Sequence, residues 1–594
     1  MGLIPKTGRG SCKVRMLHFS MFLVLTLGAV SMLAPFVLML SGATRTGVDK
    51  HEFSFLPRFL WDDAALYRKH VEALHNESAA TLRAAWRSEH ADFSGVELLS
   101  SVDAAEVARW ETHLADWPGA VLPGYAATPD SRSRPLNVRG FARHLKSEIS
   151  REIEQVNTAL ETDFADWNAF WVIPPDTRSR LNLTPDTPWW RAWEHYVNEA
   201  APEWTLGTHD LTGFFIERVW VPRHGREDGS PLLVATLPEN EREAEAWLLF
   251  VREVVHPDFL RISDQASDDW QRLLQARHVN MQTLRRATGV DADDWTELAL
   301  PTRWREAGPF QADWEVFLQG WKDPEDVLHR ISGAHLTLDS ADLSWQRAHG
   351  TPPPIREAGQ LKFERHRREI RRAFLTQHFS AVWEILIVDG RGLGNTVFYC
   401  AMAVLLALIV NPLAAYALSR FRPPNAYALL LFLLLTMAFP PMVTQIPVFL
   451  MLRDFGLLNT FWALLLPGMA HGYSIFLLKG FFDSLPRDLY ESAALDGAGE
   501  IRMFWMITFS LSKPILAVIA LGAFVSAYTN FMFALLICQD ERMWTLMVWL
   551  YQLQQSYGPG VMNAAFVLAA LPTLLVFLLA QNQIMRGIVI PVEK

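Results

Sequence analysis

A short polar segment between two apolar runs carries the most informative combination of residue types and spacing. Glu491, Ala493 and Gly497 give the spacing E-x-A-x-x-x-G. Ile507 follows ten residues after the glycine, and Pro514 comes later. These side chains are not a set that makes or breaks bonds. The alanines and glycines around them have little bulk, so the segment suits close docking of another protein rather than catalysis.

This segment is predicted to form one helix over residues 486–500. Glu491, Leu495 and Ala498 would then share one face, at i, i+4 and i+7. Gly497 would lie inside the helix, where it costs about 1 kcal/mol of helix stability relative to alanine. From the spacing alone, an ordinary amphipathic connector between two membrane helices is an equal alternative.

Polar residues inside apolar runs form the second candidate group, because such residues tend to face a bundle interior or a water-filled path. They are Asn411, Gln445, His471, Tyr528, Asn530 and Asn563. Gln445 and Asn530 are the first candidates for a translocation path, since prolines 440, 441 and 447 are expected to break the helix around Gln445. Hydrogen bonding between helices is the alternative role for each of the six.

Several function classes find no support in the sequence. No G-x-x-x-x-G-K-[ST] string is present, so we predict no ATP hydrolysis by this chain. No nucleophile–base arrangement and no cysteine–histidine spacing for zinc is found, and we therefore assign no catalytic residue, metal site or cofactor. The net charge of -10 argues against nucleic-acid binding.

Six apolar runs are long enough to cross a bilayer, which takes about 20 residues. They lie near residues 17–40, 394–418, 426–452, 459–480, 514–538 and 561–585. None of their cores contains Asp or Glu, which disfavours a proton-coupled carrier. The sequence therefore predicts a mainly α, polytopic membrane protein with six transmembrane helices.

Charge predicts the orientation of these spans. Lys6, Arg9, Lys13 and Arg15 precede the first run without an acidic residue among them, which places the N-terminus in the cytoplasm. Counting the spans then puts residues 42–392 outside, and the polar loop and the C-terminus inside. A cleaved signal peptide is the alternative for the first run.

One basic run conflicts with this orientation, because it lies on the side that should be poor in Lys and Arg. It comprises Lys362, Arg365, Arg367, Arg368, Arg371 and Arg372. Moving it inside would need another span, which would place the polar loop outside. We therefore expect the run to form a solvated or interfacial helix.

Residues 42–392 are expected to form a mostly helical extracytoplasmic domain with its own core. Most of the chain's 23 tryptophans lie in it. Helices are predicted in 141–160 and 259–288, and short strands are possible at 170–173, 213–220 and 231–236.

A weak internal repeat is also visible in this domain. Val156-Asn157, Asp166-Trp167 and Pro174 resemble Val279-Asn280, Asp294-Trp295 and Pro301, which would favour stacked helical modules. Tryptophan at such positions is expected mainly in the core, and stacking on sugar rings is the alternative.

The loop at 486–514 resembles the EAA loop of ABC importer permeases, a cytoplasmic coupling helix that docks on an ATPase subunit. AAYALSR at 414–420 and the pair Asn395-Thr396 extend the resemblance to the maltose-type carbohydrate permeases, over about the last third of the chain. The resemblance implies the type I ABC importer permease fold. It also implies that the coupling residues are Glu491, Ser492, Ala493, Asp496, Gly497 and Ile507.

The chain departs from the family pattern at three places. Ser492 stands where alanine is usual, and Phe509 with Ser510 replaces a leucine–proline pair, which bears on how the coupling helix enters the next span. The C-terminus RGIVIPVEK replaces a glycine-rich tail, which bears on the contact of that tail with the ATPase.

The expected function is that of the membrane-spanning permease subunit of an ATP-driven ABC importer in the cell inner membrane. Its expected partners are a second permease, two ATPase subunits that use ATP and Mg, an extracytoplasmic solute-binding protein and membrane lipid. The expected parts are a cytoplasmic tail (1–16), a first transmembrane helix (17–41), the extracytoplasmic domain (42–392), a five-helix core (393–586) and a second tail (587–594). A membrane-anchored sensor or scaffold is the alternative, and an enzyme in the outer domain is a third hypothesis without assignable residues.

Overall fold

The computed structural model describes residues 12–588 except 53, 118, 126–131, 133, 171–175, 184–186, 227–229, 279 and 437–439. The chain is mainly helical and forms two compact units. The first, here the membrane unit, combines Met1–Thr44 with Gln377–Lys594. The second, here the inserted unit, is Arg45–Thr376.

The membrane unit contains three single helices that are long and apolar enough to cross a bilayer. They are α1 (Cys12–Gly42), α16 (Gly392–Arg420) and α26 (Pro559–Ile588). Two bent pairs of helical segments also qualify. In the first, α19 (Phe461–Leu465) and η13 (Leu466–Gly468) meet α20 (Gly472–Asp483) at a bend of 49°. In the second, α22 (Glu500–Met503) and η14 (Phe504–Phe509) meet α23 (Lys513–Tyr528) at a bend of 87°. The described residues therefore hold three candidate spans, or five if each pair is one span, and the predicted six are not confirmed.

Besides the bent run 459–480, two further predicted spans are interrupted in the structure. The run 426–452 divides into α17 (Ala426–Thr436) and α18 (Pro441–Asp454), and the backbone is not helical at Pro440. The predicted break around Gln445 is wrong, because α18 continues through Gln445 and Pro447. The run 514–538 divides where α23 ends at Tyr528 and α24 (Met532–Ile537) begins. A hydropathy average runs across such breaks and cannot locate them.

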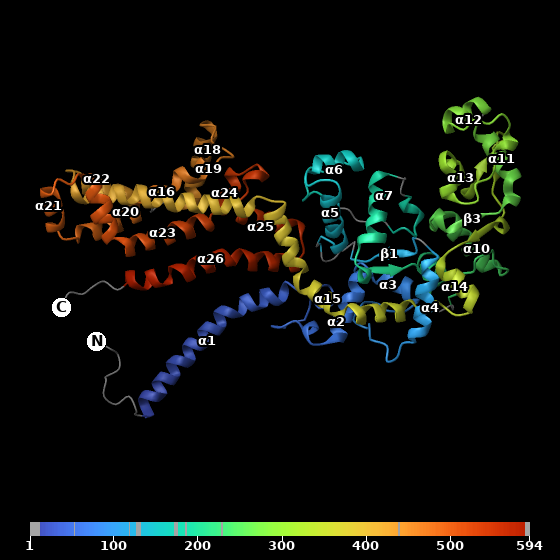
Figure 1. Ribbon diagram of the computed structural model, residues 1–594, viewed down its shortest axis with the longest axis horizontal. Helices are drawn as coiled ribbons and strands as arrows, with labels where there is room; N and C mark the ends of the chain where they lie inside the picture. The colour runs from blue at the N-terminus through green and yellow to red at the C-terminus, as the bar shows by residue number, and fades with distance from the viewer. Residues whose placement is uncertain are drawn as a thin grey trace. The chain divides into compact units, whose positions relative to one another are not determined.

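The helices of the membrane unit pack lengthwise against one another. α16 lies along α20 and α23, α23 lies along α26, and α26 contacts α1 (Figure 1). The contact of α1 with α26 is close, since a Cβ atom on Gly42 would lie 2.5 Å from Asn563 Nδ2. The remaining elements here are η12 (Glu384–Val388), η15 (Glu541–Met543) and α25 (Leu546–Ser556).

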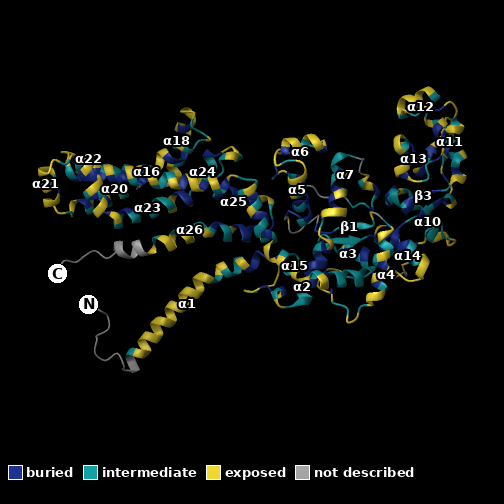
Figure 2. Ribbon diagram, in the orientation of Figure 1, coloured by how far each residue is buried: buried dark blue, intermediate teal, exposed yellow. Residues whose placement is uncertain are grey.

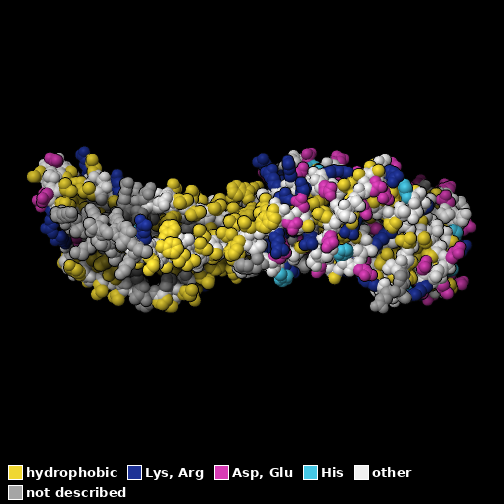
Figure 3. All heavy atoms as spheres, turned by 90° about the horizontal axis from the view of Figure 1, so that it is seen from below, with side chains coloured by type: hydrophobic (Ala, Val, Ile, Leu, Met, Phe, Trp, Pro, Cys, Tyr) yellow, Lys and Arg dark blue, Asp and Glu magenta, His cyan; other side chains and the backbone are white. Residues whose placement is uncertain are grey.

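The two units have different surfaces. α1 is exposed along most of its length (Figure 2), and large apolar side chains are exposed on α1, α17, α18 and α26. Hydrophobic side chains gather over the membrane unit, whereas charged side chains are distributed over the inserted unit (Figure 3). This difference is expected if lipid surrounds one unit and water the other.

The inserted unit is built from short helices and three two-stranded antiparallel sheets. Its helices are α2 (Asp63–Leu74), α3 (Ala79–Trp86), α4 (Ala104–Ala115), α5 (Leu136–Glu148), α6 (Ile153–Leu160), α7 (Pro188–His195), α8 (Leu211–Phe215), α9 (Val221–His224), α10 (Glu241–Leu249), α11 (Ser267–Arg277), α12 (Met281–Thr288), α13 (Gln311–Gln319) and α14 (Ala341–His349), followed by α15 (Ile355–Trp383). The sheets pair β1 (Val121–Pro123) with β2 (Leu206–Thr208), β3 (Leu260–Ile262) with β6 (Leu336–Leu338), and β4 (Trp321–Lys322) with β5 (Leu328–His329).

A repeated local arrangement precedes three of these helices. A 3₁₀ turn leads directly into a three-residue strand and then a helix at 203–215, 257–277 and 333–349. In the first copy the Asp210 side chain accepts a hydrogen bond from Gly213 N, which fixes the start of α8. This arrangement differs from the repeat read in the sequence: Asn157 lies within α6, whereas Asn280 caps the start of α12. Pro174 and Val279 of that repeat lie outside the described residues.

The local predictions for this unit fare unevenly. The strand at 213–220 is wrong, because this stretch is helical in α8 and the π-helical turn η5 (Ile216–Trp220). No strand forms at 231–236, and most of 170–173 lies outside the described residues. The helix at 141–160 is broken between α5 and α6, and 259–288 begins with β3 before α11 and α12.

Tryptophan serves mainly as core in this unit, as the sequence led us to expect. The side chains of Trp110, Trp247, Trp270, Trp314 and Trp345 are fully buried. The largest cluster gathers residues from α8 through α14.

The basic run lies on α15, and the structure accounts for most of its charge. Arg365 pairs with Glu111, while Arg367 and Arg371 both pair with Asp63. Lys362 Nζ donates to the Leu206 carbonyl oxygen at 3.1 Å. Arg368 and Arg372 are exposed, as are the paired Arg365 and Arg367. Packing within the inserted unit, rather than proximity to a membrane, explains why these cations occur here.

Candidate coupling site

Two sequence segments that lie far apart in the chain meet at one end of the membrane helices. One is the C-terminal part of α16, residues 414–420, and the other is the polar loop after α20. Tyr416 Oη donates to Glu500 Oε2 at 2.7 Å, and the Arg420 guanidinium lies over the Tyr490 ring. The segment AAYALSR therefore holds the loop in place.

A buried apolar cluster packs against the residues that make these contacts. It joins Tyr416 of α16 and Leu478 of α20 with Tyr490 and Phe504 of the loop. The Tyr490 hydroxyl also lies 2.8 Å from Thr508 Oγ1, with both side chains buried. The loop is thus anchored at both of its ends.

The helix of the loop is shorter than the sequence predicts. α21 runs from Asp488 to Leu495 and has two acidic residues, Asp488 and Glu491, in its first turn, where the helix dipole favours negative charge. It stops before Gly497, whose φ is +78°. The expectation of one helix over 486–500 with an interior glycine is therefore wrong.

Gly497 instead ends α21 in a Schellman motif. The Gly497 N–H donates to the Ala494 carbonyl at 3.0 Å, and the Ala498 N–H donates to the Ala493 carbonyl at 2.9 Å. A left-handed backbone at this position favours glycine, since other residues carry a Cβ that strains it. The glycine of the E-x-A-x-x-x-G spacing thus stabilises the end of the helix. No contact with a partner is needed to compensate for a destabilising glycine inside the helix.

The cap divides the loop into an inward and an outward side. Ala493 and Ala498 are half-buried against the apolar cluster, so Ala498 does not share the predicted face with Glu491 and Leu495. Four of the predicted coupling residues are exposed: Glu491, Ser492, Asp496 and Gly497. Ile507, the last of the predicted set, is half-buried in η14 and contacts the cluster.

Two apolar side chains stand out on this outward side. Leu495 is 90% exposed and Ile501 is 79% exposed, although both flank a well-anchored polar loop. The sequence predicted that Leu495 lies on the docking face, but it did not lead us to predict Ile501. The only indication for Ile501 was that an aliphatic residue stands beside charged neighbours. A protruding apolar pair with acidic neighbours is suited to insertion into a cleft of another protein.

The loop returns to the membrane helices through a sharp bend rather than a proline kink. η14 ends at Phe509, and α23 begins at Lys513 with Pro514 in its first turn. Ser510, which replaces the family's usual proline, lies in the bend of 87°. Pro514 tolerates this position because its missing N–H would be unsatisfied there in any case.

The six polar residues proposed for the path do not share one environment. Asn411 is buried, and its amide donates to the Ala407 carbonyl while its Oδ1 accepts from the His471 N–H at 2.8 Å. Tyr528 Oη donates to the Ala569 carbonyl of α26, and Asn530 Nδ2 donates to Tyr399 Oη at 2.9 Å. These contacts join helices to one another.

Gln445 differs from the others. It is half-buried on α18, the helix that starts after the interruption at Pro440, and its side chain has no hydrogen bond to any described residue. Asn563 is half-buried and lies against Gly42 of α1. No group of three or more His, Cys, Asp and Glu within the described residues could hold a metal ion.

Comparisons with known proteins place the last third of the chain in a family. Residues 401–588 match the family described as binding-protein-dependent transport system inner membrane component. The chain is 32% identical to protein LplC of Bacillus subtilis over 216 residues, which are 34% of this chain and 72% of that protein. It is also 32% identical to the melibiose/raffinose/stachyose import permease protein MelC of B. subtilis over 219 residues, 36% of this chain and 78% of that protein.

One solved structure is also similar. It is a bacterial ABC transporter involved in the import of the acidic polysaccharide alginate, with 27% identity over 34% of this chain and 78% of that chain and a TM-score of 0.32. The sequence match with LplC and MelC covers more than two thirds of each relative, and the match to the family spans most of α16 and the whole coupling loop. The chain is an inner-membrane permease and belongs to the family of binding-protein-dependent transport system inner membrane components.

Proposed function

We propose that the chain is the membrane-spanning subunit of an ATP-driven importer that receives a carbohydrate from an extracytoplasmic binding protein. The coupling loop supports this proposal, because its anchored base and protruding Leu495 and Ile501 form a docking surface with no partner inside the described chain. The import of melibiose, raffinose and stachyose named for MelC supports a sugar as the solute.

The proposal assigns the remaining roles to other chains. A second permease would complete the path, and two ATPase subunits would hydrolyse ATP, since this sequence has no phosphate-binding string of its own. The basic residues before α1 favour a cytoplasmic N-terminus, which puts the coupling loop on the side of the ATPases and the inserted unit outside.

Gln445 is the first candidate for contact with the solute. It stands on α18, one turn after the interruption at Pro440, and its amide is not engaged by the described residues, so it is available to bind a hydroxyl. Asn530 follows, although its present hydrogen bond to Tyr399 would have to open.

The test is ATPase activity and sugar uptake of the complex reconstituted with its co-purifying subunits. Gly497→Trp places a bulky side chain on the outward side, where a Cβ meets nothing within 4 Å. We expect both activities to fall by at least about tenfold, which corresponds to about 1.4 kcal/mol of lost docking or coupling.

A matched variant separates blocked docking from loss of the helix cap. Gly497→Asn retains a residue that tolerates the left-handed backbone and should keep most activity. Equal activity of the Trp variant and wild type, or the absence of any co-purifying ATPase, would refute the importer and favour the sensor hypothesis.

A further inference from the structure

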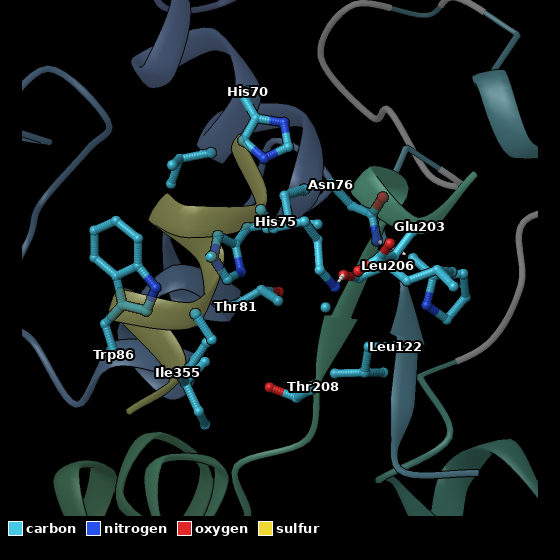
Figure 4. A pocket seen from close by; sticks show the side chains of 18 of the residues that line it. His70, His75, Asn76, Thr81, Trp86, Leu122, Glu203, Leu206, Thr208 and Ile355 are labelled. Carbon is cyan, nitrogen blue, oxygen red and sulfur yellow. Dashed lines mark hydrogen bonds between the residues drawn. The ribbon is translucent and has the colours of Figure 1, made fainter. Parts of the chain in front are cut away.

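The inserted unit encloses a cavity that no part of the transport proposal uses. Its volume is about 620 Å³, which lies within the usual range for small-molecule sites. It lies between α2, α3, α4, the first half of α15 and the β1–β2 pair (Figure 4). All of its lining residues belong to the inserted unit.

The cavity has apolar walls with polar groups set among them. Leu74, Leu122, Leu206, Ile355 and Trp86 provide apolar surface. Figure 4 shows the hydroxyl-bearing side chains of Thr81 and Thr208 bordering the same open space as Leu122 and Leu206. Both threonines are half-buried, and neither hydroxyl is hydrogen-bonded to a described residue.

Several buried polar atoms on the lining residues have no hydrogen-bond partner among the described residues. They are Tyr67 Oη, His70 Nε2, His75 Nε2, Trp110 Nε1 and Arg178 Nη1. Each of these side chains is more than nine-tenths buried. These atoms have almost no accessible surface, so a guest in the cavity does not reach them, and the polar groups that it meets are accessible ones such as the hydroxyls of Thr81 and Thr208.

The charges around the cavity largely cancel. Arg365 pairs with Glu111, and Arg178 makes two hydrogen bonds to Asp176, at 3.0 and 3.1 Å. Lys362 adds a cation, and burial lowers its pKa, while the Glu203 carboxylate nearby opposes that shift. Arg218 also lines the cavity, so three carboxylates stand beside four cations and the excess is a single positive charge.

The two imidazoles on the lining carry no charge. Burial lowers the pKa of both His70 and His75 to about 3, so both rings are neutral at physiological pH. A neutral imidazole has one donor and one acceptor nitrogen. In His70, Nδ1 is 2.9 Å from Tyr125 Oη and Nε2 has almost no accessible surface, so this ring forms part of the wall.

We propose that this cavity is a binding site for an uncharged carbohydrate of one or a few rings. Sugar hydroxyls both donate and accept, which matches the Thr81 and Thr208 hydroxyls and the amine of Lys362, while the C–H faces of the rings match the apolar walls. An aliphatic guest would leave the polar groups unpaired, and an anion would meet the carboxylates as well as the cations. The proposal stands on this lining and does not depend on the import function.

Gly359 provides a direct way to fill the cavity. It lines the cavity from the interior of α15, its φ is ordinary, and an added Cβ would meet nothing within 4 Å. An interior helical glycine costs about 1 kcal/mol relative to alanine. Retaining it here keeps space open on the wall of the cavity.

The experiment is calorimetric titration of the purified full chain, without ATPase, in a detergent that lacks a sugar head group. The probes are maltose, raffinose and diacetylchitobiose, with digalacturonate as the charged sugar and palmitate as the apolar guest. We expect at least one uncharged sugar to bind. Gly359→Phe should weaken that binding by at least about tenfold, whereas Gly359→Ala should bind as wild type and unfold at a slightly higher temperature.

Each outcome bears on the proposal. Thr81→Val, which keeps the shape and removes a hydroxyl, should weaken binding about fivefold. Binding of none of the three uncharged sugars, binding of digalacturonate or palmitate alone, or full binding by a folded Gly359→Phe chain would overturn the assignment. Because the titration contains no ATPase and measures no uptake, its failure leaves the coupling proposal unaffected, and failure of coupling leaves the cavity proposal unaffected.

Discussion

The membrane unit and the inserted unit use polar residues in opposite ways. The coupling loop leaves Glu491, Ser492 and Asp496 exposed and holds its shape by backbone hydrogen bonds at Gly497. The inserted unit buries charged groups instead: Arg180 donates to the carbonyls of Val251, Arg252 and Val255 and pairs with Glu315 at 3.3 Å. Polar side chains of the loop therefore remain at the surface in the first unit, whereas buried charge serves internal cohesion in the second.

This difference predicts that substitutions in the two units affect different measurements. Changes on the coupling loop should alter activity and leave stability unchanged, because the side chains touch little. Changes at buried charges should alter the stability of the fold. Removing one member of a buried pair leaves the other member desolvated and without the partner that compensated for it.

The largest effect is expected from the protruding apolar pair. Leu495→Asp with Ile501→Asp should reduce sugar uptake by about 100-fold, since burying each aliphatic side chain contributes about 1.5–3 kcal/mol to docking and a buried charge opposes it. The unfolding temperature of the chain should not change. A substituted complex with normal uptake would show that these side chains are not at an interface.

A large stability effect is expected from the buried arginine. Arg180→Met should lower the free energy of unfolding of the inserted unit by about 3 kcal/mol, because it leaves Glu315 and three carbonyls without their partner. Urea unfolding followed by tryptophan fluorescence measures this. Adding Glu315→Met should recover part of the loss, and a single variant within about 0.5 kcal/mol of wild type would contradict the assigned role.

An intermediate effect is expected from acid. Burial lowers the pKa of His209 to about 3, whereas an unfolded histidine titrates near 6.5, so the unfolded state binds more protons between these pH values. Its contribution to stability is present above pH 6.5 and is lost as the pH falls towards 3, by about 1.4 kcal/mol per pH unit. His209→Asn should reduce the pH slope of the unfolding free energy between pH 5.5 and 4.5 by that amount. An unchanged slope would mean that His209 titrates normally in the folded chain.

The smallest effect is expected at the anchor of the loop. Tyr490→Phe removes one buried hydrogen bond to Thr508, worth about 1 kcal/mol, so amide exchange over residues 488–508 should be about fivefold faster. Thr508→Val is the matched change from the other side. If the two effects add fully in the double variant, the two hydroxyls do not interact.

The coupling loop was more predictable from sequence than the inserted unit, for a physical reason. Its spacing, small residues and acidic first turn are local features, and α21 lies within the predicted helix. The end of α21 was mispredicted because the helix-propensity argument counted Gly497 as a destabilising residue inside the helix. A glycine near a helix end more often caps the helix. Its contact with residues 414–420 followed from tertiary packing and was not visible in the sequence.

The inserted unit shows where local patterns fail. The stretch 213–220 is rich in aromatic and branched residues, yet Asp210 caps it as a helix. The cavity was not predicted at all, because its lining comes from segments between Tyr67 and Arg365 that share no spacing. The count of six spans also relied on additive hydropathy, which does not register the interruptions at Pro440 and after Tyr528.

The Schellman cap at Gly497 has a consequence for how the permease could be matched to a different ATPase. Since main-chain hydrogen bonds fix the end of α21, the exposed side chains of Glu491, Ser492, Leu495 and Asp496 can be exchanged without changing the path of the backbone. Shape and recognition are therefore carried by separate atoms. Exchanging these four residues alone, with the glycine kept, is the smallest redesign by which the permease of one transporter could be matched to the ATPase of another.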